Sequence, residues 1–590
     1  MSENYDLLIR NGRIVDGSGA PGFNGDIAVK DGKIAAISNG EALQGDATEV
    51  IDAAGKVIAP GWVDIHTHYD GQVTWDPYLS PSSWHGVTTV VMGNCGVGFA
   101  PVRPDAHDFL IELMESVEDI PGTALHEGID WQWETFPEYL DFLDKMPRVL
   151  DVAAQMPHCA LRAYVLGDRA HDLELSPDEI TKMAELTKEA LDAGAVGFST
   201  SRTILHSSSH GYVPGTYSHP EELETIGDAM GAAGHGVFQL VSDNVGKADE
   251  MDWIGRFCET TGRPLTYLMA QSRDNPTGYL DMLDDALKMQ QDGIKIVPQV
   301  PARPTGMLYG LQSSLHPFMS HPSYKVLADK SHDEIVAKMK EPAFREQLLS
   351  EKPETTNPVA LHLLTNFAQM FPLGDPPDYE PAPETSVAAV ADREGRSPEE
   401  VAYEWMMERD GKQMMFSPLA SYVDYNLDAI GKMMDHPASV LGLSDGGAHC
   451  GLICDVSMPT YLLTHWVNGR ERGDRRPLEQ MVHLQTRSTA LAYGLDDRGL
   501  LAEGMKADIN IIDLDNMRLH APEMVNDLPS GARRLVQRAD GYHVTICSGV
   551  VTYRDGEATQ AMPGKLVRGT KDGPVMGVSS AALTGTIAAE

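Results

Sequence analysis

Short apolar runs alternate with polar, turn-rich connections at both ends of the chain. Near the N-terminus, two strand-like runs flank the turn signal Asn11-Gly12, and residues 507–513 alternate polar and apolar positions near the C-terminus. Neither end carries enough strands to bury a sheet face alone. The pattern predicts one small β-sandwich domain, built from residues 1–60 together with residues 491–590, the latter ending in a tail.

Between these ends, short apolar runs alternate with helical patterns, which is typical of parallel βα units. Residues 177–193 form the clearest helix, with Ser176 as N-cap, Pro177 at the first position and Gly194 after the end. The candidate strands are Trp62–His68, Val87–Met92, Val152–Met156, Ala195–Thr200, Val237–Val241, Leu265–Ala270, Ile294–Gln299 and Val440–Asp445. Eight strands with intervening helices predict an α/β fold, a closed (β/α)8 TIM barrel over residues 61–490.

The predicted barrel region is longer than the roughly 250 residues that a bare barrel needs. The surplus lies in Pro101–Arg148, which contains Trp131 and Trp133, and in an insertion at about residues 303–436. Inserts of this kind commonly cover the active face of a barrel as a lid. A surface decoration, or an interaction role for the Trp-containing insert, is the alternative.

Charge and composition narrow the classes of partner. The formal net charge is −40, from 86 acidic against 46 basic residues, so the surface repels phosphate backbones and anionic membranes. We therefore expect neither nucleic acid nor membrane as a partner. No signal peptide or 20-residue apolar span is visible, and the six cysteines form no regular framework, which favours a cytoplasmic protein. A homo-oligomer is compatible with these features.

The strongest chemical signal is the pair His66 and His68 at the end of an apolar run. Residues two apart on a strand point to the same side, about 6.6 Å apart at Cα, so two imidazoles can reach one metal ion. The end of a barrel strand is where barrel active sites form. An ordinary pair of core histidines is the alternative, but the position directly after the β-domain favours a metal site.

Two segments carry a family resemblance. The segment GKVIAPGWVDIHTHYD (residues 55–70) resembles the opening strand of the amidohydrolase superfamily, and GLLAEGMKADINIIDLD (residues 499–515) is similar to its return into the β-domain. The resemblance implies a β-sandwich with a barrel, one or two divalent metals, and hydrolysis of amide-like or ester-like bonds. By the same resemblance Asp445, which precedes Gly446-Gly447 at the last strand, binds metal and acts as the catalytic general base. A turn-forming aspartate is the alternative.

A third segment, HGVTTVVMGNCGVGFAPVRP (residues 85–104), resembles the D-aminoacylase branch, also called N-acyl-D-amino-acid deacylases. In that branch a cysteine replaces the carboxylated lysine that bridges metals elsewhere in the superfamily, which makes Cys95 a metal ligand. A thiolate is a suitable ligand for zinc. A buried, inert thiol is the alternative.

The sequence also departs from that branch. The fifth and sixth strands, 236–243 and 267–273, lack the histidine ligands that the branch places there, and no arginine follows the last strand until Arg470. We therefore expect one zinc ion held by His66, His68, Cys95 and Asp445, with a second zinc ion still open.

Further polar residues lie near the predicted strand ends. Arg202 and Arg303 are candidates for binding a substrate carboxylate through two parallel hydrogen bonds. His206 and His210 are spare metal ligands on a loop. The candidate substrate-binding residues are His158, Arg202, Gln239, Gln271, Arg303 and His449, and a purely structural role is the alternative for each.

These features predict a metal-dependent hydrolase that cleaves the amide bond of N-acyl amino acids through a metal-activated water. The D configuration follows from the resemblance alone, and the partner is a small-molecule amide. Hydrolysis of another linear or cyclic amide or imide is the nearest alternative. A metal-binding protein without catalysis, favoured by the missing histidines, is the alternative from a different class.

Overall fold

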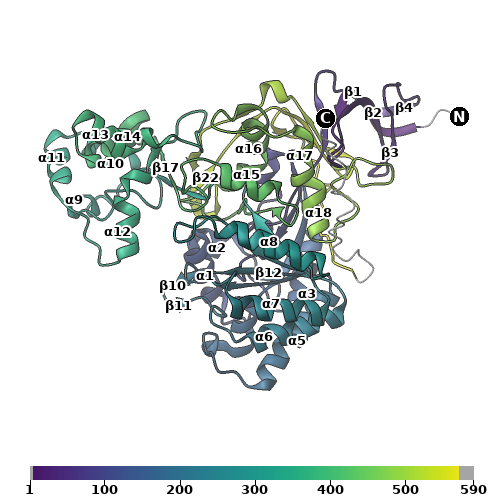
Figure 1. Ribbon diagram of the computed structural model, residues 1–590, viewed down its shortest axis with the longest axis horizontal. Helices are drawn as coiled ribbons and strands as arrows, with labels where there is room; N and C mark the ends of the chain where they lie inside the picture. Colours follow the sequence, from purple (N-terminus) through teal and green to yellow (C-terminus); the bar gives the residue numbers. More distant parts are fainter. Residues whose placement is uncertain (1–3, 571–590) are drawn as a thin grey trace.

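Eight parallel strands form the central sheet of the computed structural model, which describes residues 4–570 (Figure 1). They are β6 (Trp62–Asp64), β7 (Val87–Met92), β8 (Asp151–Pro157), β9 (Gly197–Arg202), β12 (Val237–Ser242), β13 (Leu265–Leu268), β14 (Ile296–Val300) and β18 (Val440–Leu441). Their order in the sheet follows their order in the sequence, from β6 to β18. Each of the eight predicted strands overlaps one of them.

The first and last strands of this sheet meet, which closes it into a barrel. Thr67 and Gly446 form a parallel bridge just beyond β6 and β18. The His68 N–H donates to the Gly446 carbonyl at 2.8 Å, and the Asp445 N–H donates to the His66 carbonyl at 3.1 Å. The predicted α/β barrel is confirmed, although β6 and β18 are shorter than expected and all three of these polar residues follow regular strand.

Helices on the outside of the barrel connect successive strands. Residues 177–193 were predicted as a helix, and α5 (Pro177–Asp192) begins there with a capping box in which Ser176 and Glu179 cap each other's backbone N–H groups. The other helices next to the barrel strands are α4 (His158–Leu166), α6 (Pro220–Ala233), α7 (Ala248–Thr261), α8 (Gly278–Gln291), α15 (Asp428–Asp435), α16 (Met458–Tyr461), α17 (Leu478–His483) and α18 (Thr489–Ala492).

A nine-stranded sheet combines both ends of the chain, as predicted. Its strands are β1 (Asn4–Ile14), β2 (Phe23–Lys30), β3 (Lys33–Ile37), β4 (Asp46–Asp52), β5 (Val57–Pro60), β19 (Ile509–Ile512), β24 (Tyr542–Cys547), β25 (Val550–Arg554) and β26 (Glu557–Ala558). Antiparallel pairing of β5 with β19 joins the two halves. The domain bounds given above stay a prediction, and residues 571–590 of the predicted tail lie outside the described residues.

The first insert packs closely against the barrel. It contains α1 (His107–Glu118), α2 (Gly122–Gly128) and α3 (Phe136–Lys145). The indole N–H of buried Trp133 donates to the Phe99 carbonyl at 2.8 Å, and the Tyr139 hydroxyl donates to the Asp70 carbonyl at 2.9 Å. These contacts fix the insert onto the loops that follow the first two barrel strands.

The second insert forms a helical cluster with its own apolar core, and Figure 1 shows it projecting to one side of the barrel. Its elements are β15 (Gly306–Tyr309), α9 (Pro322–Lys325), α10 (His332–Met339), α11 (Pro342–Ser350), α12 (Pro358–Thr365), β16 (Phe371–Pro372), α13 (Val387–Glu394), α14 (Pro398–Gly411) and β17 (Met415–Pro418). Small two-stranded pairs complete the fold: β10 (Ser207–Ser208) with β11 (Gly211–Tyr212), β20 (Arg518–Leu519) with β23 (Ala539–Asp540), and β21 (Glu523–Val525) with β22 (Arg534–Val536). Within residues 4–570, no helix is both long and apolar enough for a membrane crossing.

Candidate metal centre

Four predicted ligands converge at the C-terminal ends of the barrel strands. His66 and His68 follow β6, Cys95 follows β7, and Asp445 follows β18; both histidines and Cys95 are buried. The sequence suggested that the histidines lie on the strand, but β6 ends at Asp64, and the bridge between Thr67 and Gly446 holds the segment instead. Cys95 and Asp445 have positive φ angles of 57° and 48°. Non-glycine residues in this conformation cost energy and cluster at functional sites.

The distances between donor atoms are compatible with a shared metal ion for three of the four residues. The Cys95 Sγ lies 3.3 Å from His66 Nε2, and the Asp445 Oδ1 lies 3.5 Å from His66 Nε2 and 3.7 Å from His68 Nε2. Donor atoms of His66, His68 and Cys95 lie within 4.8 Å of one another. Ligands held 2.0–2.3 Å from one ion in a tetrahedron are roughly 3.3–3.8 Å apart. His66, His68 and Cys95 therefore form a compact three-ligand group, and Asp445 approaches the two histidines from the segment after β18.

Neighbouring polar groups orient two of these ligands. The Gln299 Oε1 lies 2.9 Å from His66 Nδ1, so Nδ1–H donates to it and the Nε2 lone pair faces the other ligands. The backbone N–H of Cys95 donates to the Gln239 Oε1 at 2.9 Å. Gln239 was a candidate substrate-binding residue, and here it supports the loop that carries the thiol.

Glu118 lies at the candidate centre, although the sequence analysis did not predict it there. It lies at the end of α1 in the first insert, is 2% exposed, and places Oε1 3.4 Å from His68 Nδ1. Its Oε2 lies 3.6 Å from the His449 Nε2, and its carbonyl accepts the His449 backbone N–H. The available signal was an acidic residue at the end of an amphipathic helix in an insert expected to cover the site.

Burial and neighbouring charges shift the pKa values of the four candidate ligands in different directions. Burial lowers the pKa of His66 to about 4, so this ring is neutral at physiological pH. Burial also lowers the pKa of His68, but the carboxylates of Glu118 and Asp445 raise it well above the usual histidine value. Burial alone would raise the pKa of Asp445, yet the rings of His68 and His66 hold it well below the usual range. Burial raises the pKa of the Cys95 thiol to about 12, and a bound metal ion would deprotonate it.

The remaining predicted residues have protein partners. The His158 ring lies 2.8 Å from both Thr200 Oγ1 and Glu222 Oε1. Arg202 donates to both carboxylate oxygens of Glu250, at 2.9 and 3.1 Å.

Gln271 hydrogen-bonds Asp424 and the loop around Ser421. The ring of the spare candidate His206 lies 2.9 Å from Ser201 Oγ and interacts electrostatically with Glu118 and His68, whereas exposed His210 pairs with Glu112.

Arg303 is fully buried next to a cavity that contains Asp445. Asp445, Asp455 and Cys454 line this cavity, and the Arg303 guanidinium lies 3.1 Å from Asp455 Oδ1 and 3.7 Å from the centre of the Tyr379 ring. Within the described part of the chain, Arg303 Nε and Nη1 and Asp455 Oδ2 have no hydrogen-bond partner. Burial raises the pKa of Asp455 to about 7. Arg303 therefore keeps two donors unpartnered among the described residues in addition to its ion pair with Asp455, whereas the Nε and Nη2 of Arg202 are both bound to Glu250.

Comparison with known proteins identifies similar chains. The amidohydrolase family model matches residues 49–553. The chain is 36% identical over 199 residues to a D-aminoacylase of Alcaligenes xylosoxydans xylosoxydans, covering 34% of this chain and 38% of that protein. It is 31% identical over 235 residues to an N-acyl-D-glutamate deacylase of the same organism, covering 40% and 43%. An uncharacterized protein of Mycobacterium tuberculosis is 38% identical over 200 residues, covering 33% and 32%. The matches thus span between 32% and 43% of each relative's length.

Solved structures show the same fold. The N-acyl-D-glutamate deacylase of Bordetella bronchiseptica, solved with zinc and a phosphonate mimic of the tetrahedral intermediate, is 21% identical with a TM-score of 0.63, covering 96% of this chain and 100% of that one. A D-aminoacylase described by one-metal activation and second-metal attenuation of its binuclear centre is 20% identical with a TM-score of 0.62 over the same shares.

Proposed function

The chain belongs to the amidohydrolase family, and we propose that it hydrolyses the amide bond of N-acyl-D-amino acids with one zinc ion. It is a metal-dependent amidohydrolase acting on carbon–nitrogen bonds other than peptide bonds. The observation that carries the proposal is the close grouping of His66, His68 and Cys95, with the Asp445 carboxylate 3.5 and 3.7 Å from the two histidines. The substrate class is supported by the relatives that act on D-aminoacyl compounds.

The proposed mechanism assigns a role to each residue. A bound zinc ion would lower the pKa of a water molecule from 15.7 to about 7 and polarise the scissile carbonyl. Asp445 keeps its carboxylate ionised, because the neighbouring histidines hold its pKa low, and it accepts the proton of the attacking water. Asp445 then returns that proton to the departing amine nitrogen. Gln299 keeps the Nε2 of His66 directed to the site, and Glu118 lies against Nδ1 of His68.

Binding of a single ion is favoured because glutamines, and no histidines, occur in the fifth and sixth barrel strand regions. Within β12, Gln239 hydrogen-bonds the Cys95 backbone, and after β13, Gln271 hydrogen-bonds Asp424. Neither side chain offers a metal-binding imidazole. The solved D-aminoacylase for which one metal activates and a second attenuates supports a one-metal enzyme here.

A substrate carboxylate needs a cationic partner, because an unpaired charge is costly in a buried site. Arg303 is the residue we propose for this role, since its Nε and Nη1 have no partner in the described chain and it contacts Asp455 and Cys454, which line a cavity together with Asp445. Arg202 is already neutralised by Glu250, and we expect it to be structural.

A substrate panel tests the proposal. Zinc-loaded full-length protein is assayed with N-acetyl-D- and N-acetyl-L-amino acids, their carboxamide analogues, and cyclic hydantoins. We expect the D-amino acid derivatives to turn over fastest and the neutral analogues to be slower. Faster turnover of neutral or cyclic amides would replace the substrate class while leaving the hydrolase chemistry, and loss of all turnover on zinc-loaded protein would contradict the proposal.

A further inference from the structure

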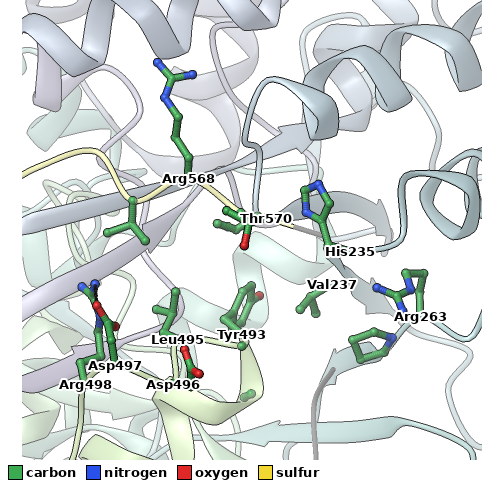
Figure 2. Close-up of a pocket in the computed structure, with 17 residues that line it drawn as sticks. His235, Val237, Arg263, Tyr493, Leu495, Asp496, Asp497, Arg498, Arg568 and Thr570 are labelled. Carbon is green, nitrogen blue, oxygen red and sulfur yellow. Dashed lines mark hydrogen bonds and ion pairs between the residues drawn. The ribbon is translucent and has the colours of Figure 1, made fainter. Parts of the chain in front are cut away.

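A second cavity lies at the opposite end of the barrel, where strands β9, β12 and β13 begin (Figure 2). Its volume is about 250 Å³, far more than a single water molecule needs. One wall comes from residues that precede these strands, another from the turn after α18, and a third from residues 567–570. This last segment pairs with the barrel, since the Val567 N–H donates to the Val152 carbonyl at 2.7 Å.

One arginine in this cavity lacks an anionic partner. Arg263 is 8% exposed, and its Nη1 donates to the Gly234 carbonyl at the end of α6 at 2.6 Å. Its Nε is buried with no hydrogen-bond partner, and no carboxylate of residues 4–570 forms an ion pair with it. Burial lowers the pKa of Arg263, and burial together with the charge of Arg263 lowers the pKa of nearby Lys295. The local positive charge is therefore uncompensated in a chain of net charge −40.

Acidic residues face Arg263 across the cavity. Figure 2 shows Asp496, Asp497 and Arg498 across the cavity from Arg263, and the Arg498 Nε donates to Asp497 at 2.8 Å. The guanidinium of Arg568 points away from the cavity and lies 2.8 Å from Asp141. An occupant thus meets a guanidinium without an anionic partner among the described residues at one end and an acidic wall at the other.

We propose that this cavity binds a small monocarboxylate, whose carboxylate group is held by Arg263. A guanidinium presents a planar array of donors that matches a carboxylate, and a buried guanidinium is stabilised by such a partner. The acidic wall formed by Asp496 and Asp497 repels a second negative charge on the ligand. Carboxylate binding in this cavity does not depend on the reaction proposed for the metal centre. Amide hydrolysis does, however, release a carboxylic acid of this chemical class.

The test is calorimetric titration of the full-length, zinc-loaded protein with acetate, propionate and malonate at constant ionic strength. We expect acetate and propionate to occupy one Arg263-dependent site per chain and malonate to bind more weakly. Arg263→Met should weaken this binding by roughly tenfold or more, the range for a charge-assisted hydrogen bond. Arg256→Met is the matched control, because it removes the same charge elsewhere. Arg256 is an exposed arginine on α7 that pairs with Glu224.

Carboxylate binding at the metal centre would be unchanged in the Arg263 variants, which distinguishes it from binding in the cavity. Thermal unfolding identifies any variant that fails to fold. If Arg263→Met does not fold, Arg263→Lys replaces it, because lysine keeps the positive charge but loses the planar donors. Arg263→Lys should also weaken binding. Three results would overturn the proposal: no saturable site beyond the metal centre, undiminished binding in a folded Arg263 variant, or equal heats with chloride.

Discussion

Replacing Glu118 by glutamine removes the charge behind His68 while keeping the shape of the side chain. Glu118 Oε1 and His68 Nδ1 lie 3.4 Å apart, both atoms are buried, and neither has a hydrogen-bond partner in the described chain. Zinc binding at Nε2 would strengthen the interaction of these two atoms. Carboxylates in this position contribute roughly 10- to 100-fold to metal affinity, equivalent to about 1.4–2.7 kcal/mol.

The assay is competition for zinc between the protein and a chelator of known affinity at fixed pH. Glu112→Gln is the matched control, because Glu112 lies on the same helix but is exposed and pairs with His210. We expect Glu118→Gln to lose roughly 10- to 100-fold in zinc affinity, with the control unchanged. Equal zinc affinity of Glu118→Gln and the parent protein would refute the assignment of Glu118 as a positioning residue.

Three further predictions follow from the same geometry. Asp445→Asn should keep its fold and lose roughly 10²–10⁴-fold in turnover, measured on protein of verified zinc content; near-normal turnover would exclude Asp445 as the proton carrier. Arg303→Ala should raise KM selectively for carboxylate-bearing amides, and equal effects on neutral amides would argue against a carboxylate clamp. Burial lowers the pKa of His68, but Glu118 and Asp445 raise it by more, so the pKa lies well above the usual histidine value. Metal-free His68 is therefore protonated at neutral pH, and zinc binding must release that proton. Zinc affinity should therefore rise with pH, and a flat profile would contradict this protonation state.

The strands of the barrel were predictable because their apolar runs are long enough to stand out from the helical pattern between them. Their ends were not, because His66 and Asp445 leave regular strand geometry to approach one another. Positive φ angles at Leu443 and Asp445 end β18 early, and a hydrophobicity pattern carries no information about such angles.

The grouping of the candidate ligands His66, His68 and Cys95 was predictable because their motifs are local in sequence. Glu118 was not, because its place depends on how the first insert docks through contacts such as Trp133 with Phe99. Likewise, the position of Arg202 at a strand end was visible, but its partner Glu250 comes from the following helix α7. Partners that are distant in sequence decide whether such a residue is free to bind substrate.

The central claim is one zinc ion held by His66, His68, Cys95 and Asp445. It is tested most directly by elemental analysis of dialysed, full-length protein beside a Cys95→Ala, Asp445→Ala double variant that removes two of the four ligands. The account predicts about one zinc per chain in the parent protein and far less in the variant. Two tightly held metals in the parent, or zinc content unchanged in the variant, would contradict it.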